Sequence, residues 1–457
     1  MSVFVPLYKL QNLYKEKLAT LEKDLTITST IDEEDLKPVY NPATKKFAVP
    51  TYQYQKRSQI QAYKVFTHYS DGVKYVAIPY SYYYHHLSEA PKRKTHHAQR
   101  KMKFVGNLLE RQAAIKDDAI EILNRTGSIL LSLHTGFGKT IFTLYLLSKI
   151  GMKTLVFCHR AIIIQQWIEA IAKYLPDAKV KVLQTKDTEF DNYDIVIANP
   201  TNICKLPMSV YEPFGCLIMD EVHTMCTEKN SEALRVLSPS YVVGLSATPQ
   251  RSDGMDAMLE LYLGPEMINK PLRKQFSVYK ISTGFTVKGS SSWTEVISAQ
   301  AKIPERNVLL CKLVWFFSKR NILVLVKLVE HANILQKMLQ AIGEDVDVFM
   351  EGMKKVNYSC RVLIATYSKG GVGFDHPKLD MLIGAGDVEE NFIQYLGRVF
   401  RRDDVQPLYI DIKDKLGALN EHSKTRIDIC TSMGANVFPF KTTFKRFEAL
   451  TEHLRWE

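Results

Sequence analysis

A glycine-bearing loop that runs into a Lys-Thr pair carries the strongest chemical signal in the sequence. It reads Thr135-Gly-Phe-Gly-Lys-Thr140 and follows a short apolar segment. Gly136 and Gly138 let the backbone turn its N–H groups toward one centre, where they can hold phosphate oxygens. Lys139 can reach the β- and γ-phosphates, and the Thr140 hydroxyl can bind Mg²⁺. The pattern predicts a phosphate-binding loop that includes Thr135 and takes a nucleoside triphosphate.

Two adjacent carboxylates form the second signal. Asp220 and Glu221 follow the apolar residues 216–219, 81 residues after Lys139. If residues 216–219 form a strand of a parallel sheet, both side chains lie at its carboxyl edge, beside the phosphate loop. We expect Asp220 to hold Mg²⁺ through its shell and Glu221 to polarise the water that attacks the γ-phosphate.

Short apolar segments must supply the sheets that position these groups. Their apolar residues are continuous rather than alternating, as is typical of a parallel sheet covered by helices on both faces. Helical stretches such as 141–150 and 162–174 separate them. The predicted strands are 129–133, 154–158, 195–198, 216–219 and 241–245, followed by 276–282, 321–326, 361–365, 382–384 and 408–412. The fold class is therefore α/β, with two doubly wound parallel-sheet domains in tandem at 104–265 and 267–457.

Residues 1–103 differ from the rest in charge and aromatic content. They hold 17 Lys and Arg against nine Asp and Glu, which is +8 of the net charge of +11, and 12 of the 23 tyrosines. This composition predicts a small basic α+β module that contacts a polyanion, most simply nucleic acid. The alternative is a small domain with a solvated basic face. The basic run Pro91–Lys103 is interpreted as a linker that touches nucleic acid, or alternatively as a nuclear-localisation signal.

The remaining composition predicts an intracellular protein. Seven cysteines occur without a C-x-x-C pair, which suits a reducing compartment and argues against a structural zinc site. The sequence has no apolar run long enough to span a membrane, and its first residues do not resemble a signal peptide.

The motifs, in their order, resemble those of superfamily 2 helicases of the DExH type. The resemblance implies two RecA-like domains, ATP and Mg²⁺ as cofactors, and nucleic acid as substrate. It also implies that Gln112 reads the adenine edge, that Asp220-Glu-Val-His223 is the DExH box, and that His223, Ser246 and Thr248 couple hydrolysis to strand movement. In the second domain it implies that Thr366 touches the nucleic-acid backbone, that Gly373 and Asp375 bind ATP, and that Gln394, Arg398 and Arg401 form the last motif.

The two arginines also support this assignment on physical grounds. Because Arg398 and Arg401 are three residues apart, we expect them to share one helix face. Coming from the second domain, they could meet the γ-phosphate held by the first. They would then act as arginine fingers supplied in cis, so that hydrolysis depends on closure of the cleft.

Flanking residues refine the resemblance. The segment Gly244–Met255 and the later Tyr409–Asp414 resemble helicases of large cytoplasmic DNA viruses, a group that includes the poxvirus transcript-release helicase and is related to XPB-type helicases. We therefore expect an ATP-driven DNA helicase that acts in viral transcription or in replication or repair, in a transcription or replication complex. If the source is viral, the expected location is the host cytoplasm or the virion, with the nucleus as the alternative through Pro91–Lys103. An RNA-directed helicase and an ATP-switched remodeller of a polymerase complex are the alternative functions.

Overall fold

The computed structural model describes residues 1–13, 15–29, 39–41, 46–48, 59–88, 97–184, 187, 189–249, 253–272, 274–286, 293–353, 355–370, 376–388, 392–402, 404–415 and 417–441. The chain divides into two compact units, Met1–Pro271 and Leu272–Glu457. Gly373, Asp375 and residues 91–96 of the basic run lie outside the described residues.

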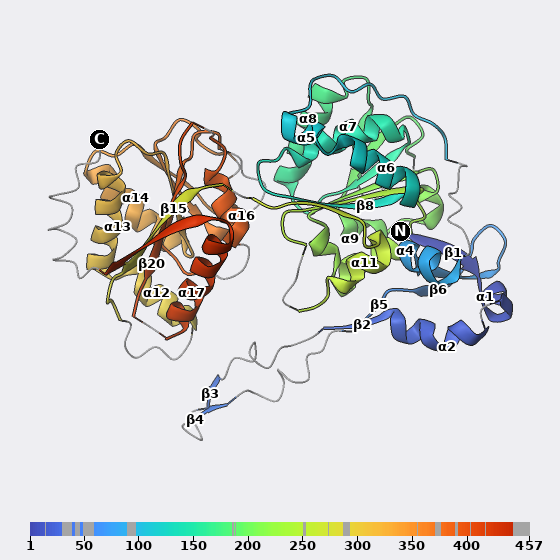
Figure 1. The fold of residues 1–457 in the computed structure, drawn as a ribbon, viewed down its shortest axis with the longest axis horizontal. Helices are drawn as coiled ribbons and strands as arrows, with labels where there is room; N and C mark the ends of the chain where they lie inside the picture. Colours follow the sequence, from blue (N-terminus) through green and yellow to red (C-terminus); the bar gives the residue numbers. More distant parts are fainter. Residues whose placement is uncertain are drawn as a thin grey trace. The chain divides into compact units, whose positions relative to one another are not determined.

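Seven parallel strands form the main sheet of the first unit, in the order β10-β11-β9-β12-β13-β8-β14. Their bounds are β8 Ser128–Leu133, β9 Thr154–Phe157, β10 Val180–Val182, β11 Ile195–Ala198, β12 Cys216–Asp220, β13 Tyr241–Ser246 and β14 Met267–Lys270. The helices are α5 Glu110–Ala113, α6 Lys116–Thr126, α7 Lys139–Ile150, α8 Ala161–Tyr174, α9 Pro200–Ile203, α10 Glu228–Arg235 and α11 Ala257–Leu263. Helices α7 and α8 lie on one side of this sheet, and α9 and α11 lie on the other (Figure 1).

The five predicted strands of this unit are all present, and every residue of β8, β9 and β11 is buried. Strands β10 and β14 add to them, and β14 pairs with β8 along Met267–Lys270. The first unit therefore extends to Pro271, a few residues beyond position 265, because the chain after Pro265 still forms a strand of the first sheet.

The second unit repeats this architecture with seven parallel strands, in the order β17-β18-β16-β19-β20-β15-β21. Their bounds are β15 Phe276–Ser282, β16 Ile322–Val326, β17 Val346–Phe349, β18 Val362–Thr366, β19 Met381–Gly384, β20 Leu408–Lys413 and β21 Ala435–Lys441. The helices are α12 Trp293–Ala301, α13 Pro304–Phe316, α14 Val329–Ala341, α15 Tyr367–Gly370, α16 Phe392–Leu396 and α17 Gly417–Ser432. Helices α13 and α14 lie on one side of the sheet and α17 on the other (Figure 1). The predicted pair of doubly wound α/β domains is thus confirmed.

The N-terminal residues form small antiparallel sheets and helices. Strands β1 Ser2–Pro6, β7 Lys74–Pro79 and β6 Lys64–Thr67 make a three-stranded sheet, and β2 Thr26–Thr28 pairs with β5 Gln59–Gln61 and β3 Val39–Asn41 with β4 Lys46–Ala48. Helices α1 Leu7–Leu13, α2 Lys15–Asp24 and α4 Tyr80–Tyr82 accompany them. A hairpin turn at Asp71-Gly72 joins β6 to β7, and Gly72 supplies the positive φ of 65°.

This N-terminal part shares its apolar core with the first main sheet. Buried residues from both form one cluster, which includes Val5 and Ile78 on one side and Met258 and Tyr262 on the other. The Tyr262 hydroxyl donates a hydrogen bond of 2.8 Å to the Ala62 carbonyl. The boundary predicted at residue 103 is therefore crossed by a continuous core. No helix among the described residues is long and apolar enough to span a membrane.

Candidate active site

The predicted catalytic groups of the first unit meet at the carboxyl edge of its sheet. Strands β12, β13 and β8 are neighbours in parallel register, with Asp220 beside Leu245 and Ser246 beside Ser132. The phosphate loop begins where β8 ends, so the loop and Asp220 emerge at the same edge, two strands apart. Lys139 is near enough to Asp220 for its charge to lower the pKa of that carboxyl, against the effects that raise it. The parallel topology thus brings Lys139 and Asp220 to the same edge of the sheet, although they are 81 residues apart in the sequence.

The loop has the predicted turn geometry. Gly136 and Gly138 have φ values of 84° and 87°, a region that favours glycine, and α7 begins at Lys139 directly after them. The Lys139 ammonium donates a hydrogen bond of 3.1 Å to the Leu133 carbonyl. The Thr135 hydroxyl oxygen is buried without a hydrogen-bond partner among the described residues. Thr140 follows in the first turn of α7 and is half-buried.

Gln112 is fully buried, and its amide is bonded to the phosphate loop. Its Nε2 donates to the carbonyls of Phe137 and Gly138, both at 3.1 Å, and its Oε1 accepts from the Leu109 N–H at 2.9 Å. A Cβ atom on Gly138 would lie 2.4 Å from Nε2, so the close approach requires glycine there. Gln112 therefore braces the loop in this structure, and the reading of adenine by this residue stays a prediction.

The carboxylate of Asp220 is held by one N–H on each oxygen. The Trp167 indole Nε1 donates to Oδ2 at 2.9 Å, and the backbone N–H of Glu221 donates to Oδ1 at 3.0 Å. Burial, followed by the charge of Glu221, raises the pKa of Asp220 to about 6. Trp167 is fully buried, and the sequence contains no local signal for its hydrogen bond to Asp220.

Glu221 has the only positive φ, 50°, among the non-glycine residues that the structure describes. Its Oε2 is buried without a hydrogen-bond partner among those residues and lies 3.6 Å from the Nδ1 of His223. An uncommon backbone conformation of this kind is found where a side chain is directed to a particular place. The arrangement leaves one carboxylate oxygen, next to Asp220 at the end of β12, without a hydrogen bond among the described residues.

His223 connects the acidic pair to the next strand. Its Nδ1 lies 3.0 Å from the Oγ of Ser246, and the same Oγ accepts a hydrogen bond of 3.1 Å from the backbone N–H of Thr248. Ser246 is fully buried at the end of β13. The structure thus brings together the three residues for which a coupling role was predicted.

In the second unit, Thr366 is buried at the end of β18 and is bonded to a carboxylate. Its hydroxyl lies 3.1 and 3.2 Å from the two oxygens of Glu351, and the hydroxyl of Ser368 also contacts this carboxylate. Sequence reasoning missed Glu351, which comes just after β17 in a segment without a distinctive pattern. The predicted nucleic-acid contact of Thr366 stays a prediction.

The last motif differs from the expected helix. Gln394 is buried in α16, which ends at Leu396. Arg398 lies in the tighter 3₁₀ turn Gly397–Val399, and Arg401 lies beyond it. The expectation that both arginines share one α-helical face is therefore wrong, because the helix ends between Gln394 and Arg398. Their role toward the γ-phosphate stays a prediction.

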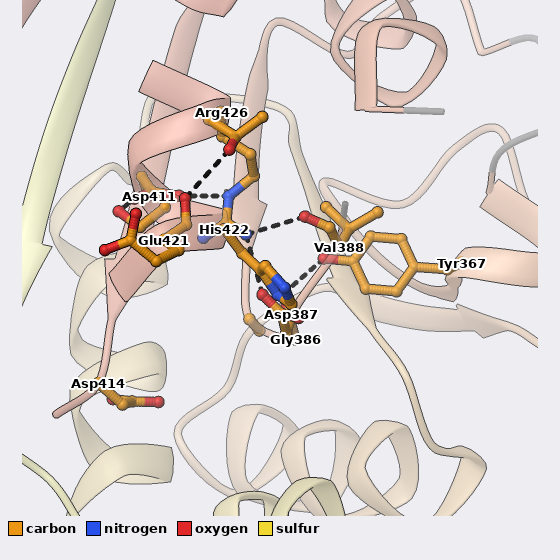
Figure 2. A network of polar contacts seen from close by, with 12 residues as sticks. Tyr367, Gly386, Asp387, Val388, Asp411, Asp414, Glu421, His422 and Arg426 are labelled. Carbon is orange, nitrogen blue, oxygen red and sulfur yellow. Dashed lines mark hydrogen bonds and ion pairs between the residues drawn. The ribbon is translucent and has the colours of Figure 1, made fainter. Parts of the chain in front are cut away.

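A buried polar network connects α17 to β20 and to the residues that follow β19 (Figure 2). Arg426 of α17 donates from Nη1 to the Oδ1 of Asp387 at 3.0 Å and to the Val388 carbonyl at 2.9 Å, and from Nε to the Oδ1 of Asp411 at 2.8 Å. The Nδ1 of His422 lies 2.6 Å from the Oδ2 of Asp387. Asp387 comes shortly after β19, so the reasoning from strand ends that found Asp220 could have found it as well.

Comparisons with known proteins agree with this arrangement. The family described as "Type III restriction enzyme, res subunit" matches residues 96–251. "Putative helicase 161L" of Invertebrate iridescent virus 6 is 32% identical over 372 residues, which cover 74% of this chain and 84% of that protein. "Putative helicase 055L" of Frog virus 3 is 28% identical and covers 72% and 79%. "Putative ATP-dependent RNA helicase QP509L" of African swine fever virus is 24% identical and covers 74% and 75%.

Among solved structures, "S. cerevisiae Dbp5 bound to RNA and ADP BeF3" superposes with a TM-score of 0.53 at 13% identity, covering 76% of this chain and 97% of that one. At this identity the likeness shows the fold alone, which is that of tandem RecA-like domains. The relatives from viruses show more, because the iridovirus protein is similar over most of its own length. The chain therefore belongs to the superfamily 2 helicases, which are ATP-hydrolysing enzymes.

Proposed function

We propose that this enzyme is a DExH-type helicase that uses ATP to move along DNA and separate its strands. The observation that carries the proposal is the link from Glu221 through His223 to Ser246 and Thr248, at the edge where the phosphate loop begins. A change at the γ-phosphate would alter Glu221 and its neighbour His223, and through Ser246 it would reach the loop that follows β13. A change at the bound nucleotide would thus reach the residues between β13 and α11.

ATP would lie on the phosphate loop, with the roles of its residues set by their types. Lys139 would exchange the Leu133 carbonyl for phosphate oxygens, and Gly136 and Gly138 would present their N–H groups. Thr140 and Asp220 supply a hydroxyl and a carboxylate, the oxygen ligands that suit Mg²⁺ when phosphate oxygens and water complete its shell. Bound Mg²⁺ would neutralise charge on the β- and γ-phosphates.

The fit of this donor set is supported by how Asp220 is held. Each of its oxygens accepts one N–H, from Trp167 and from Glu221, so each keeps a lone pair for the shell. Glu221, with one buried oxygen that accepts no hydrogen bond among the described residues, would orient and polarise the attacking water.

The second domain would complete the site on closure. Arg398 and Arg401 would reach the γ-phosphate, Gln394 would support them, and Gly373 and Asp375 would contact ATP. Thr366 would bind the phosphodiester backbone, a contact that does not depend on base sequence. The buried ion pairs of Arg426 with Asp387 and Asp411 would keep the chain before α16 in place during this movement.

The N-terminal part would add to nucleic-acid affinity. Lys64 and Lys74 are exposed on β6 and β7, and the residues up to position 103 carry most of the net positive charge. Such a surface binds phosphates without regard to sequence, and its contribution falls as salt rises. The basic run Pro91–Lys103 would extend this contact or direct the protein to the nucleus.

There are two alternatives to the proposed DNA helicase: one differs in its substrate and the other in its activity. The name of the African swine fever virus relative describes an RNA helicase, and the yeast structure holds RNA, which favours RNA as the alternative substrate. The third candidate is a nucleotide-switched remodeller of a transcription or replication complex. The relatives are viral proteins, which supports a role in a virus. That this role is transcript release or replication, and that the chain is related to the poxvirus and XPB-type helicases, rests on the segments Gly244–Met255 and Tyr409–Asp414.

The test is ATP hydrolysis by the full chain with no nucleic acid, single-stranded DNA, duplex DNA, single-stranded RNA or duplex RNA, with Lys139→Ala as the control for contaminating ATPase. Strand separation of a tailed DNA duplex and its RNA counterpart is measured in parallel. Stimulation and unwinding with DNA support the proposal. Preference for RNA selects the RNA helicase, and ATPase activity that no nucleic acid stimulates selects the remodeller.

A further inference from the structure

Trp167 lies in the core of the first unit, on the inner face of α8. Its side chain is fully buried, and Ile163 and Ile171, one turn away on either side, are buried with it. Packing alone accounts for a large ring at this position, yet it does not account for where the ring's one polar atom points. A buried indole N–H usually finds an acceptor, and the choice of acceptor is informative.

The acceptor is Asp220, a residue 53 positions away that the proposed function places in the Mg²⁺ shell. The Nε1–Oδ2 distance of 2.9 Å is that of a good hydrogen bond to a charged group. The other oxygen, Oδ1, is bonded to the backbone N–H of Glu221. One rigid donor on each oxygen fixes the plane of the carboxylate. Without the indole, only the backbone bond would resist rotation of the group, while the neighbouring charge of Glu221 would repel it.

We propose that Trp167 is a positioning residue that holds the Asp220 carboxylate in the orientation that completes the Mg²⁺ shell of bound ATP. This inference rests on the proposed function, because it assumes that Asp220 serves Mg²⁺. Outer residues that orient a metal's ligands typically change metal affinity by about 10–100-fold when they are replaced. A tryptophan that only fills space would not change the Mg²⁺ dependence of nucleotide binding.

The test is Trp167→Phe, which keeps an aromatic ring and removes the N–H. Binding of a fluorescent ATP analogue to the full chain is measured with Mg²⁺ and with EDTA. We expect the gain in affinity that Mg²⁺ gives to fall about 10-fold, while affinity in EDTA stays the same. The matched control is Trp315→Phe on the outer side of α13, where the ring is 63% exposed, and it should change neither value.

A double-mutant cycle shows whether Trp167 acts through Asp220. In an Asp220→Asn background, Trp167→Phe should have no further effect on the dependence on Mg²⁺, because the group that it positions no longer serves the ion. Equal losses with Mg²⁺ and with EDTA, or a loss that persists in the Asp220→Asn background, would overturn the inference in favour of a packing role.

A measurement that keeps Trp167 in place covers the case in which Trp167→Phe does not fold. The chain has four tryptophans, so 5-fluorotryptophan labelling gives four ¹⁹F signals, and replacing the other three one at a time leaves the fourth as Trp167. The Trp167 signal should shift with nucleotide and Mg²⁺ together more than with nucleotide in EDTA; equal shifts would refute the inference. If nucleotide does not bind under either condition, the proposed function fails, and the inference fails with it.

Discussion

Gln112 offers a sharp test of how the phosphate loop is held. The resemblance to helicases implies that this glutamine reads adenine, whereas the structure shows its amide bonded to the loop itself. The two roles predict different outcomes for Gln112→Ala. A residue that only reads adenine should change the preference for ATP over GTP and leave stability alone. A residue that braces the loop should change stability and weaken both nucleotides together.

The size of the effect follows from the bonds that are lost. Gln112 makes three, two from Nε2 to the carbonyls of Phe137 and Gly138 and one from the Leu109 N–H to Oε1. At about 1 kcal/mol for each neutral hydrogen bond, the loss is about 3 kcal/mol. The Gly138 carbonyl keeps a bond from the Phe142 N–H, so it is not left without a partner. For a unit of this size the loss corresponds to a fall in Tm of roughly 6–12 °C.

The assay is thermal unfolding together with steady-state hydrolysis of ATP and of GTP. Gln165→Ala is the matched control, since Gln165 is exposed on α8 and, among the described residues, its side chain is bonded to Glu169 of the same helix. We expect a lower Tm for Gln112→Ala and KM values that rise by a similar factor for both nucleotides, because the loop binds the phosphates that they share. A Tm within about 1 °C of the unchanged protein, with a KM that rises for ATP only, would refute the bracing role.

Three further predictions concern single side chains. Lys139→Ala should abolish ATP hydrolysis and leave Tm nearly unchanged, because the ammonium serves the ligand; near-normal turnover would contradict its place in the site. Glu221→Gln should keep ATP binding, lower kcat by about 100-fold or more and accumulate an ATP-bound form on nucleic acid; loss of ATP binding would show that Glu221 organises the metal instead. Glu351→Gln should raise nucleic-acid affinity several-fold, because it removes a negative charge that Thr366 now contacts, and a filter-binding assay that finds weaker binding would show that Glu351 supports Thr366.

Most of the fold could be predicted because parallel strands that are buried on both faces have continuous apolar sequences. The segments that form β8, β9, β11, β12 and β13 are continuous and apolar. Their local sequence therefore favours the same strands that tertiary packing requires. The phosphate loop was as clear, because positive φ at two positions calls for glycine. Strand β14 was missed because three of its four residues are exposed at the sheet edge, which gives no apolar run.

What could not be predicted are contacts between residues far apart in the chain. Gln112 could be recognised as a candidate site residue from its motif. The direction of its amide, toward the phosphate loop, depends on how α5 packs against that loop. The two arginines of the last motif have helical spacing, yet the chain tightens into a 3₁₀ turn after Leu396. Spacing alone could not show this, because a helix end is set by packing as much as by local preference.

The same strand-end signal has different uses in the two sheets. Asp220 ends β12 and Asp387 follows β19 by three residues, so each carboxylate stands near the carboxyl end of an apolar parallel strand. The hydrogen bonds to Asp220 come from a neutral indole and a backbone amide, which orient the carboxylate without forming an ion pair with it. Asp387 is paired instead with Arg426, itself 4% exposed, and with His422. A buried ion pair is expensive to disrupt, because removing one partner leaves the other charge buried and unpaired, while a carboxylate without an ion-pair partner can attract a cation. We therefore expect the buried partner to determine whether a strand-end acid serves structure or chemistry, and in both sheets that partner comes from a helix more than 35 residues away in the chain.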